Sequence, residues 1–213
     1  MLTLDGIKDT AKRHTPQSIG TWQYCSVLLP LVEKDGSLYV LYEQRSENHN
    51  VQPGEVSFPG GGIKDGENAR EAALRETIEE LGLPESAIEI AAQLDYLISH
   101  ASLRLDCFLG IIDPEALEKA NINHQEVEDF FLVPLAWLLE NEPAVYTNIL
   151  KPEPAPDIPI ERIAPKGGYV WRGGVSEVPV YFWPDPETGK ERVIWGMTAR
   201  LTMAFVDLLR KGL

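Results

Sequence analysis

With 213 residues, 44% of them hydrophobic, the chain is long enough for one sizeable core, and we expect a single domain over residues 1–213. The formal net charge is −14, so the chain lacks the overall positive charge that attracts extended nucleic acids and anionic membranes. Neither is expected as a partner. No segment reaches the roughly 18 consecutive apolar residues of a membrane span, and the first residues lack the order of a secretory signal, which predicts a cytoplasmic protein.

The first half of the chain is predicted to form two helical segments and a hairpin, and it contains a cluster of glycines. The elements expected there are a helical segment at Leu4 to Arg13, strands at Trp22 to Val32, Ser37 to Tyr42 and Glu55 to Phe58, and a helix at Ala69 to Leu81. The turn signal Lys34-Asp35-Gly36 between the first two strands is typical of a hairpin. The last of these strands leads into the cluster Gly60-Gly61-Gly62.

The second half alternates strands with short helical segments. The expected strands are Ala87 to Ile98, Arg104 to Ile112, Phe130 to Pro134, Tyr169 to Trp171 and Val178 to Trp183, and the helical segments are Pro114 to Ala120, Leu135 to Glu140 and Met197 to Lys211. The stretch at about 141–191 is rich in Pro and Gly, so we interpret it as an embellishment on one domain.

Two cysteines, Cys25 and Cys107, each lie in an apolar run that predicts a strand. Their number and setting favour buried free thiols over a disulfide framework or a zinc site. Neither thiol is expected to take part in catalysis.

Local signals support the helix at Ala69 to Leu81. Asn68 and Glu71 have the spacing of a capping box, with Asp65 as an alternative cap, and Gly82 is well placed to end the helix.

Three carboxylates share one face of this helix. At about 100° per residue, Glu79 and Glu80 fall within about 60° of Glu76. The opposite face carries the aliphatic residues Leu74, Ile78 and Leu81, and short alanines near the carboxylates are expected to leave space for a partner: Ala69, Ala72 and Ala73. The carboxylates repel one another, and a hard cation such as Mg²⁺ or Mn²⁺, shared with substrate phosphates, would relieve that repulsion. A solvated acidic face is the alternative interpretation.

The glutamates belong to a longer pattern from Gly61 to Leu83, called here the box segment. It contains Gly61, five residues, Glu67, seven residues, and then Arg75-Glu76-Thr77-Ile78-Glu79-Glu80-Leu81-Gly82-Leu83. This resembles the Nudix box, G-x5-E-x7-R-E-U-x-E-E-x-G-U with U an aliphatic residue, and all seven fixed positions match. Thr77, at the first aliphatic position, is the one departure, and it is expected to point away from the metal face.

The resemblance implies both a fold and a chemistry. Nudix proteins are α/β/α sandwiches with a central mixed β-sheet, and they hydrolyse a nucleoside diphosphate linked to another group with the help of metal ions that lower the pKa of water. The implied metal ligands are Glu76, Glu79, Glu80 and the backbone carbonyl of Gly60. Two further residues, Glu67 and Arg75, are implied to orient the catalytic glutamates through charge-assisted hydrogen bonds.

A further carboxylate outside the box often reaches the metal site in this family. The loop Asn123 to Glu128, just ahead of a predicted strand, resembles the segment that carries it. Glu126 is the candidate general base or extra ligand, Glu128 is the second candidate, and a solvated loop carboxylate is the alternative for either. His124 is interpreted as a surface residue or a residue at the substrate rim.

Upstream of the box, the chain resembles the coenzyme A pyrophosphatase branch, whose signature is roughly L-L-T-x-R-S-x-x-L-R-x-H-x-G-x-V-x-F-P-G-G. The matching residues are Arg45, Ser46, Gly54, Val56, Phe58 and Pro59. Three positions depart from the signature: His49 stands for Leu, Asn50 for Arg and Gln52 for His. Val193 to Arg200 also resembles the ending of this branch, Trp-Gly-x-Thr.

The resemblance implies cleavage of coenzyme A, or an acyl derivative, to 3′,5′-ADP and 4′-phosphopantetheine or its acyl form. Arg45 and Ser46 are the candidate substrate contacts, because a guanidinium group can grip phosphate oxygens, and a strand-end salt bridge is the alternative for Arg45. Core packing is favoured over a coenzyme contact for Trp171, Tyr181 and Trp183.

Other functions stay open. The departures at Asn50 and Gln52 favour another dinucleotide or sugar nucleotide, such as NADH, ADP-ribose or a diadenosine compound. A non-catalytic nucleotide-binding regulator is a third possibility, against which the intact glutamates argue. The apolar N-terminal segment is compatible with a homodimer.

Overall fold

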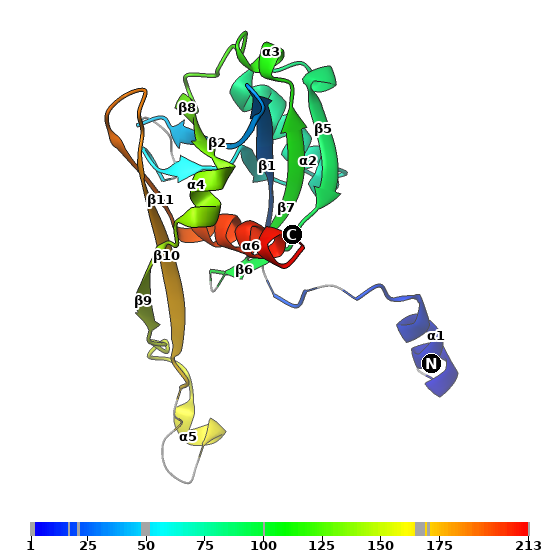
Figure 1. The fold of residues 1–213 in the computed structure, drawn as a ribbon. Helices are drawn as coiled ribbons and strands as arrows, with labels where there is room; N and C mark the ends of the chain where they lie inside the picture. The colour runs from blue at the N-terminus through cyan, green and yellow to red at the C-terminus, as the bar shows by residue number, and fades with distance from the viewer. Residues whose placement is uncertain are drawn as a thin grey trace.

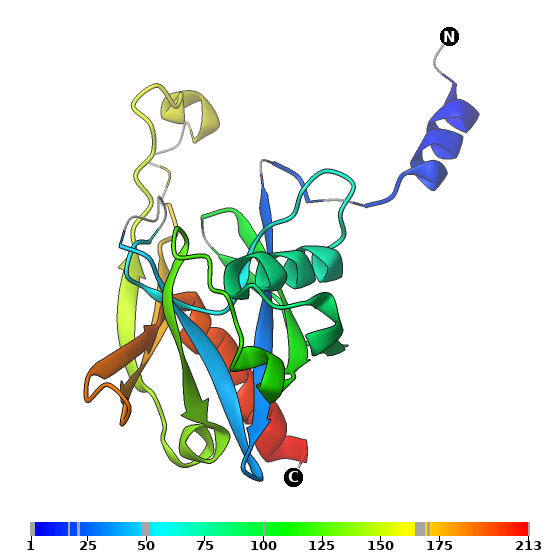
Figure 2. The same cartoon turned by 90° about the horizontal axis from the view of Figure 1, so that it is seen from above.

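The computed structural model describes residues 3–16, 18–20, 22–47, 52–99, 101–164, 169 and 171–212, and it folds them into two β-sheets with surrounding helices (Figures 1 and 2). The helices are α1 (Leu4–Arg13), α2 (Ala69–Leu81), α3 (Pro114–Leu117), α4 (Leu135–Glu140), α5 (Ile160–Ile163) and α6 (Gly196–Gly212), with a single 3₁₀ turn at Glu85–Ala87. The strands are β1 (Gln23–Lys34), β2 (Ser37–Arg45), β3 (Val56–Ser57), β4 (Gly60–Gly62), β5 (Ile88–Gln93), β6 (Leu97–Ser99), β7 (Leu103–Ile112), β8 (Val127–Pro134), β9 (Ala144–Leu150), β10 (Gly174–Pro184) and β11 (Glu191–Trp195). None of the helices described here has the length and apolarity needed to cross a membrane.

A mixed sheet of eight strands forms the centre of the fold. Its order is β3-β2-β1-β7-β5, with β4 beside β1, β6 beside β7 and β8 beside β2. β1 and β7 run parallel, from the pair Gln23 and Leu103 to the pair Val32 and Ile112, while β2 and β4 are antiparallel to β1. The predicted hairpin is confirmed, and its turn uses positive φ angles of 52° at Asp35 and 72° at Gly36.

Each face of the central sheet buries its own apolar cluster under a helix. Leu28, Leu41 and Phe108 lie in the cluster that includes Leu81 of α2. On the opposite face, a larger cluster joins aromatic residues of the sheet to α6, and its members include Tyr42, Phe58, Phe131 and Phe205. Burying one such side chain contributes about 1.5–3 kcal/mol. The layers of helix, sheet and helix confirm the α/β/α sandwich with a central mixed sheet.

The stretch at about 141–191 forms most of a second sheet, in the order β11-β10-β9. Arg192 of β11 connects this sheet to the central one, because its guanidinium binds Asp129 of β8 at 2.7 Å and Asp185 at the end of β10 at 3.1 Å. Tyr181 and Trp183 of β10 are buried in the larger cluster, which agrees with the core interpretation of these two aromatic residues.

Several predicted boundaries are wrong. The predicted strand Ala87 to Ile98 is divided into β5 and β6, and the pairing of β5 with β7 is irregular between Ile90 and Ala92. Tyr169 and Trp171 lie outside any strand, and the core interpretation of Trp171 is wrong because its side chain is exposed. β4, β9, β11 and α5 were not predicted. By contrast, α1, α2 and α4 have the expected bounds, and α1 lies apart from the sheets (Figures 1 and 2).

The alanines expected to leave space beside the carboxylates do not do so. Ala72 and Ala73 have no exposed surface, and Ala73 belongs to the apolar cluster under α2. Both cysteines are free, as expected, but only Cys107 is buried, while Cys25 is half-buried.

Candidate active site

The box helix α2 is fixed at both ends by local interactions. Asn68 Oδ1 accepts a hydrogen bond from Glu71 N–H at 3.0 Å, and the Glu71 carboxylate accepts one from Asn68 N–H at 2.9 Å, which completes the predicted capping box. Gly82 ends the helix with a φ of 64°, and a Cβ at this position would collide with the backbone of Asn121. These ends set the position of every carboxylate along α2.

The glycine strand β4 brings backbone directly against α2. Gly61 pairs with Ser26 of β1, and Gly60 N–H donates to Glu80 Oε2 at 2.8 Å. A Cβ on Gly61 would come within 2.5 Å of Glu76 Oε1. Because β4 carries no side chains, two box glutamates can lie against it.

Arg75 holds three carboxylates at once. Its Nε and Nη2 donate to the two oxygens of Glu67 at 2.8 and 3.0 Å, and its Nη1 lies 2.8 Å from Glu76 Oε1 and 3.1 Å from Glu79 Oε2. The hydrogen bonds from Arg75 lower the pKa of Glu67 to about 2, and the backbone N–H of Lys64 adds to the effect. This geometry suits the orienting role expected of Arg75 and Glu67.

Two carboxylates at the site are buried. They are Glu80 on the box helix α2 and Glu43 on β2, with exposed fractions of 3% and 1%. Burial raises the pKa of Glu80 to about 8, a backbone N–H and Arg45 oppose the rise, and the charges of Glu76 and Glu126 add to it. Burial also raises the pKa of Glu43 well above its ordinary value, and the charge of Glu80 is the next cause. Burial and mutual repulsion therefore favour the neutral, protonated form of both carboxyl groups, and a bound cation would favour their charged form.

Glu43 was not among the predicted site residues. It lies in the run Leu41-Tyr42-Glu43, where a single glutamate in a strand usually points to solvent. One signal was available, because the coenzyme A signature has threonine two residues before its arginine and this chain has glutamate there. Neither carboxylate oxygen of Glu43 has a hydrogen-bond partner among the described residues.

The loop ahead of β8 brings Glu126, and not Glu128, to the buried carboxylates. The Glu126 carbonyl accepts a hydrogen bond from Ser46 N–H at 2.9 Å, which ties the loop to the end of β2. The half-buried Glu126 raises the pKa of both buried carboxylates. The side chains of Glu128 and His124 are exposed.

The donor set suits Mg²⁺ or Mn²⁺, which prefer carboxylate oxygens. Across the described ranges, no three Asp, Glu, His or Cys side chains already converge as a metal cage, and Arg75 holds Glu76 and Glu79 instead. The unpartnered oxygens of Glu43 and the crowding of negative charge around Glu80 are what a cation would compensate. The metal-ligand roles, including that of the Gly60 carbonyl, stay predictions.

A cavity of about 450 Å³ opens beside β4 and reaches α6, a size common for small-molecule sites. Arg45 and Gln52 give it polar groups, and the remaining residues include Cys25, Phe58, Gly61, Gly62, Met197 and Thr198. Ser46 is buried and is not part of the lining. His49 and Asn50 lie outside the described residues.

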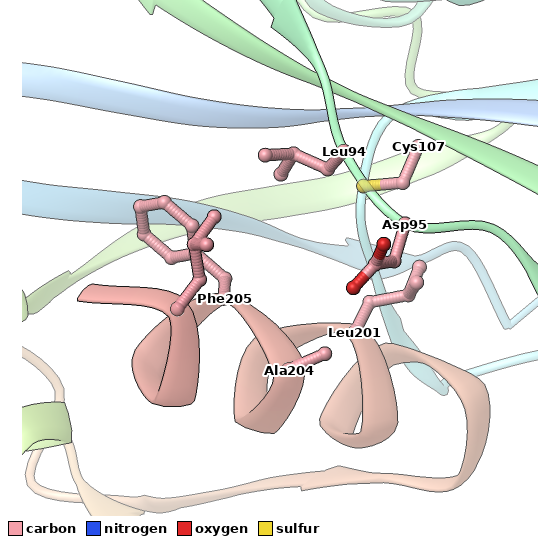
Figure 3. Close-up of a pocket in the computed structure, with 7 residues that line it drawn as sticks. Leu94, Asp95, Cys107, Leu201, Ala204 and Phe205 are labelled. Atoms are coloured by element: carbon pink, nitrogen blue, oxygen red, sulfur yellow. The ribbon is translucent and has the colours of Figure 1, made fainter. Parts of the chain in front are cut away.

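A second cavity, between α6 and the segment joining β5 to β6, is far smaller. Figure 3 shows Asp95 and Cys107 on one side of it and Leu201, Ala204 and Phe205 on α6. Its volume of about 20 Å³ suits a single water molecule. It therefore has no room for a nucleotide.

A family model described as the NUDIX domain matches residues 25–151, more than half of the chain. The chain is 32% identical over 179 residues to a peroxisomal coenzyme A diphosphatase of Mus musculus, with 84% of this chain and 66% of the relative covered. It is 39% identical over 117 residues to Nudix hydrolase 3 of Caenorhabditis elegans, with 54% of this chain and 49% of the relative covered. The chain thus spans about half to two thirds of the length of these relatives. A MutT/nudix family protein from Enterococcus faecalis superposes with a TM-score of 0.49 and 15% identity, over 99% of this chain and 69% of that one.

Proposed function

Because the chain belongs to the NUDIX-domain family, we propose that it is a metal-dependent pyrophosphohydrolase whose active site is the box segment. The observation that carries this proposal is the packing of Glu76 and Glu80 against the glycine strand, beside a cavity that also contains Arg45. Nudix hydrolases generally use divalent metal ions such as Mg²⁺. Here such an ion would be held by Glu76, Glu79, Glu80 and the Gly60 carbonyl, and it would neutralise the pyrophosphate and make the attacking water more acidic.

The other roles that we propose are supported by the positions of the side chains. Arg75 and Glu67 hold the box glutamates in register. Glu126 lies beside the buried carboxylates and accepts the proton of the attacking water in the proposed reaction. Glu128 is the alternative base, and its exposed side chain makes it the weaker candidate. Arg45 lines the cavity and contacts phosphate oxygens of the substrate.

The proposed substrate is coenzyme A or an acyl derivative, cleaved to 3′,5′-ADP and 4′-phosphopantetheine or its acyl form. Support comes from the partial signature around Arg45, from the cavity volume and from the printed name of the mouse relative. A second candidate is another dinucleotide or sugar nucleotide, such as NADH, ADP-ribose or a diadenosine compound. It is favoured by Gln52, which lines the cavity where the signature has histidine.

The decisive experiment incubates the protein with Mg²⁺ or Mn²⁺ and each of these compounds, and identifies the products by mass spectrometry. We expect turnover of coenzyme A to the two products named above. Turnover of another compound with coenzyme A inert would overturn the substrate assignment. Binding without turnover of any compound would favour a nucleotide-binding regulator.

The matched variants are Glu80→Gln, which removes a buried charge of the box, and Glu33→Gln, which changes an exposed glutamate at the end of β1. We expect the first to lower kcat by several hundredfold or more, on the order of the effects seen for groups acting in the transition state, and the second to leave it unchanged. Equal kcat values for the two variants would remove Glu80 from the mechanism.

The extent of the domain, the partner and the compartment are also proposals. We propose one domain over residues 1–213, a small nucleotide as the ligand, a possible homodimer and a cytoplasmic location. The mouse relative carries a peroxisomal name, and fractionation of cells that express the chain would decide between the two compartments.

A further inference from the structure

Glu43 is a buried carboxylate that faces more negative than positive charge. It lies on β2 with 1% of its surface exposed, and neither of its oxygens accepts a hydrogen bond from any described residue. Buried carboxylates in proteins are normally paired or hydrogen-bonded, because a charge removed from water must be compensated.

The charges that face Glu43 make its position still less favourable. Glu80 and Glu76 act on it from α2, Glu126 acts from the loop ahead of β8, and Arg45 acts from its own strand. Three acidic groups and one basic group therefore face Glu43. Arg45 also acts on Glu80, so its single charge is shared between two buried carboxylates.

We propose that Glu43 is an additional ligand of a divalent cation, which it holds together with Glu80 and Glu126 beneath the box helix. This inference rests on the proposed function, because it adds a ligand from β2 to the set that the box supplies. Carboxylate oxygens from three separate elements would then surround the ion, which is the oxygen-rich environment that Mg²⁺ and Mn²⁺ take. Among the described residues, no three such side chains converge in the metal-free structure, so the proposal requires these three to move together when the ion binds.

Glu43 lies outside the box segment, on a different element from the box glutamates. Glu76 and Glu79 are held by Arg75 at the more exposed side of α2, whereas Glu43 and Glu80 lie beneath it. A cation at the buried pair would be shielded from water by the helix above it. We therefore expect one tight cation position that persists when Arg75 is replaced.

The test measures metal binding directly and does not depend on turnover. The full chain is stripped with a chelator and titrated with Mn²⁺, and free Mn²⁺ is followed by electron paramagnetic resonance. We expect Glu43→Gln to weaken the tightest Mn²⁺ site by about 10- to 100-fold, and Glu33→Gln to leave it unchanged. The metal-free Glu43→Gln protein should melt at least as high as the parent, because the variant removes buried repulsion. Unchanged affinity and stoichiometry in Glu43→Gln would overturn the proposal.

A measurement on the unaltered protein covers the case in which Glu43→Gln fails to fold. Fe²⁺ replaces Mn²⁺, and ascorbate with peroxide then cuts the backbone close to the bound metal. Cuts at β2 around Glu43 as well as within α2 are expected, and cuts confined to α2 would contradict the inference. The two proposals fail separately, because Mn²⁺ binding that depends on Glu43 without hydrolysis of any nucleotide would overturn the proposed function alone.

Discussion

Arg75 and Glu67, which are eight residues apart in the chain, are joined by two parallel hydrogen bonds. One runs from Nε to Oε1 at 2.8 Å and the other from Nη2 to Oε2 at 3.0 Å. The pair joins the loop that precedes α2 to the middle of the helix. Because Nη1 of the same guanidinium contacts Glu76 and Glu79, the orientation of the box glutamates depends on this pair.

Replacing Arg75 with Lys should therefore disturb catalysis more than stability. An ammonium group cannot make two parallel bonds to Glu67, so the neighbouring glutamates lose their orientation. We expect kcat on the turned-over substrate to fall about 10- to 100-fold with KM little changed, measured by steady-state kinetics. Arg70→Lys, at an exposed position on the same helix, is the control. A variant at Arg75 that keeps full kcat would show that the network has no orienting role.

Gly61→Ala and Gly62→Ala are a matched pair of variants that tests how closely the backbone of β4 approaches the box carboxylates. A Cβ on Gly61 would press on the Glu76 carboxylate, whereas one on Gly62 would meet no atom within 4 Å. We expect Gly61→Ala to lower kcat by about 100-fold, since a displacement of about 1 Å at a catalytic group can cost that much. Gly62→Ala should stay close to the parent. Equal activities in the two variants would contradict the placement of Glu76 against β4.

The two thiols should differ in reactivity. Burial raises the pKa of Cys107 to about 12, and burial together with the charge of Glu76 raises the pKa of Cys25 to a lesser extent. Because the thiolate is the reactive form, alkylation of both should slow below the ordinary thiol pKa and quicken as pH rises. With iodoacetamide at pH 8, mass spectrometry should find Cys25 modified first. Coenzyme A in excess should protect Cys25, which lines the 450 Å³ cavity. Faster modification of Cys107 would show that the core opens readily.

Arg192 should matter for stability and not for chemistry. Its side chain is 9% exposed, it pairs with Asp129 and the buried Asp185, and its guanidinium lies 4.8 Å from the centre of the Phe131 ring. Arg192→Leu leaves Asp185 buried without its cation, so we expect a loss of about 3 kcal/mol in the free energy of unfolding. Urea denaturation measures it, with the exposed Arg172→Leu as control. A loss below about 1 kcal/mol would mean that water readily replaces the guanidinium.

Elements with local signals could be predicted from the sequence. The capping box at Asn68 and the terminal Gly82 define α2 completely, because all the atoms involved lie within one segment. β9 could not be predicted in this way. Its pairing with β10 joins residues far apart in the chain, such as Tyr146 and Val178, and its own side chains are almost all exposed.

The same distinction separates Glu80 from Glu43 at the candidate site. The box motif identifies Glu80, because motif and helix share one stretch of chain. The burial of Glu43 depends on which helix covers β2, and the alternation of residues along a strand cannot reveal that both faces of the strand are covered. A buried glutamate in a strand is recognised only once the layers are assembled.

The parallel pairing of β1 with β7 also sets an order of events during synthesis. The paired residues lie about 80 positions apart, and α2 is made between them. As the chain leaves the ribosome, the helix can form from its own caps, but its apolar side gains the cover of β7 only after Ile112 has been added. The cover of this side of α2 is therefore complete only when a strand that follows the helix in the chain has been made.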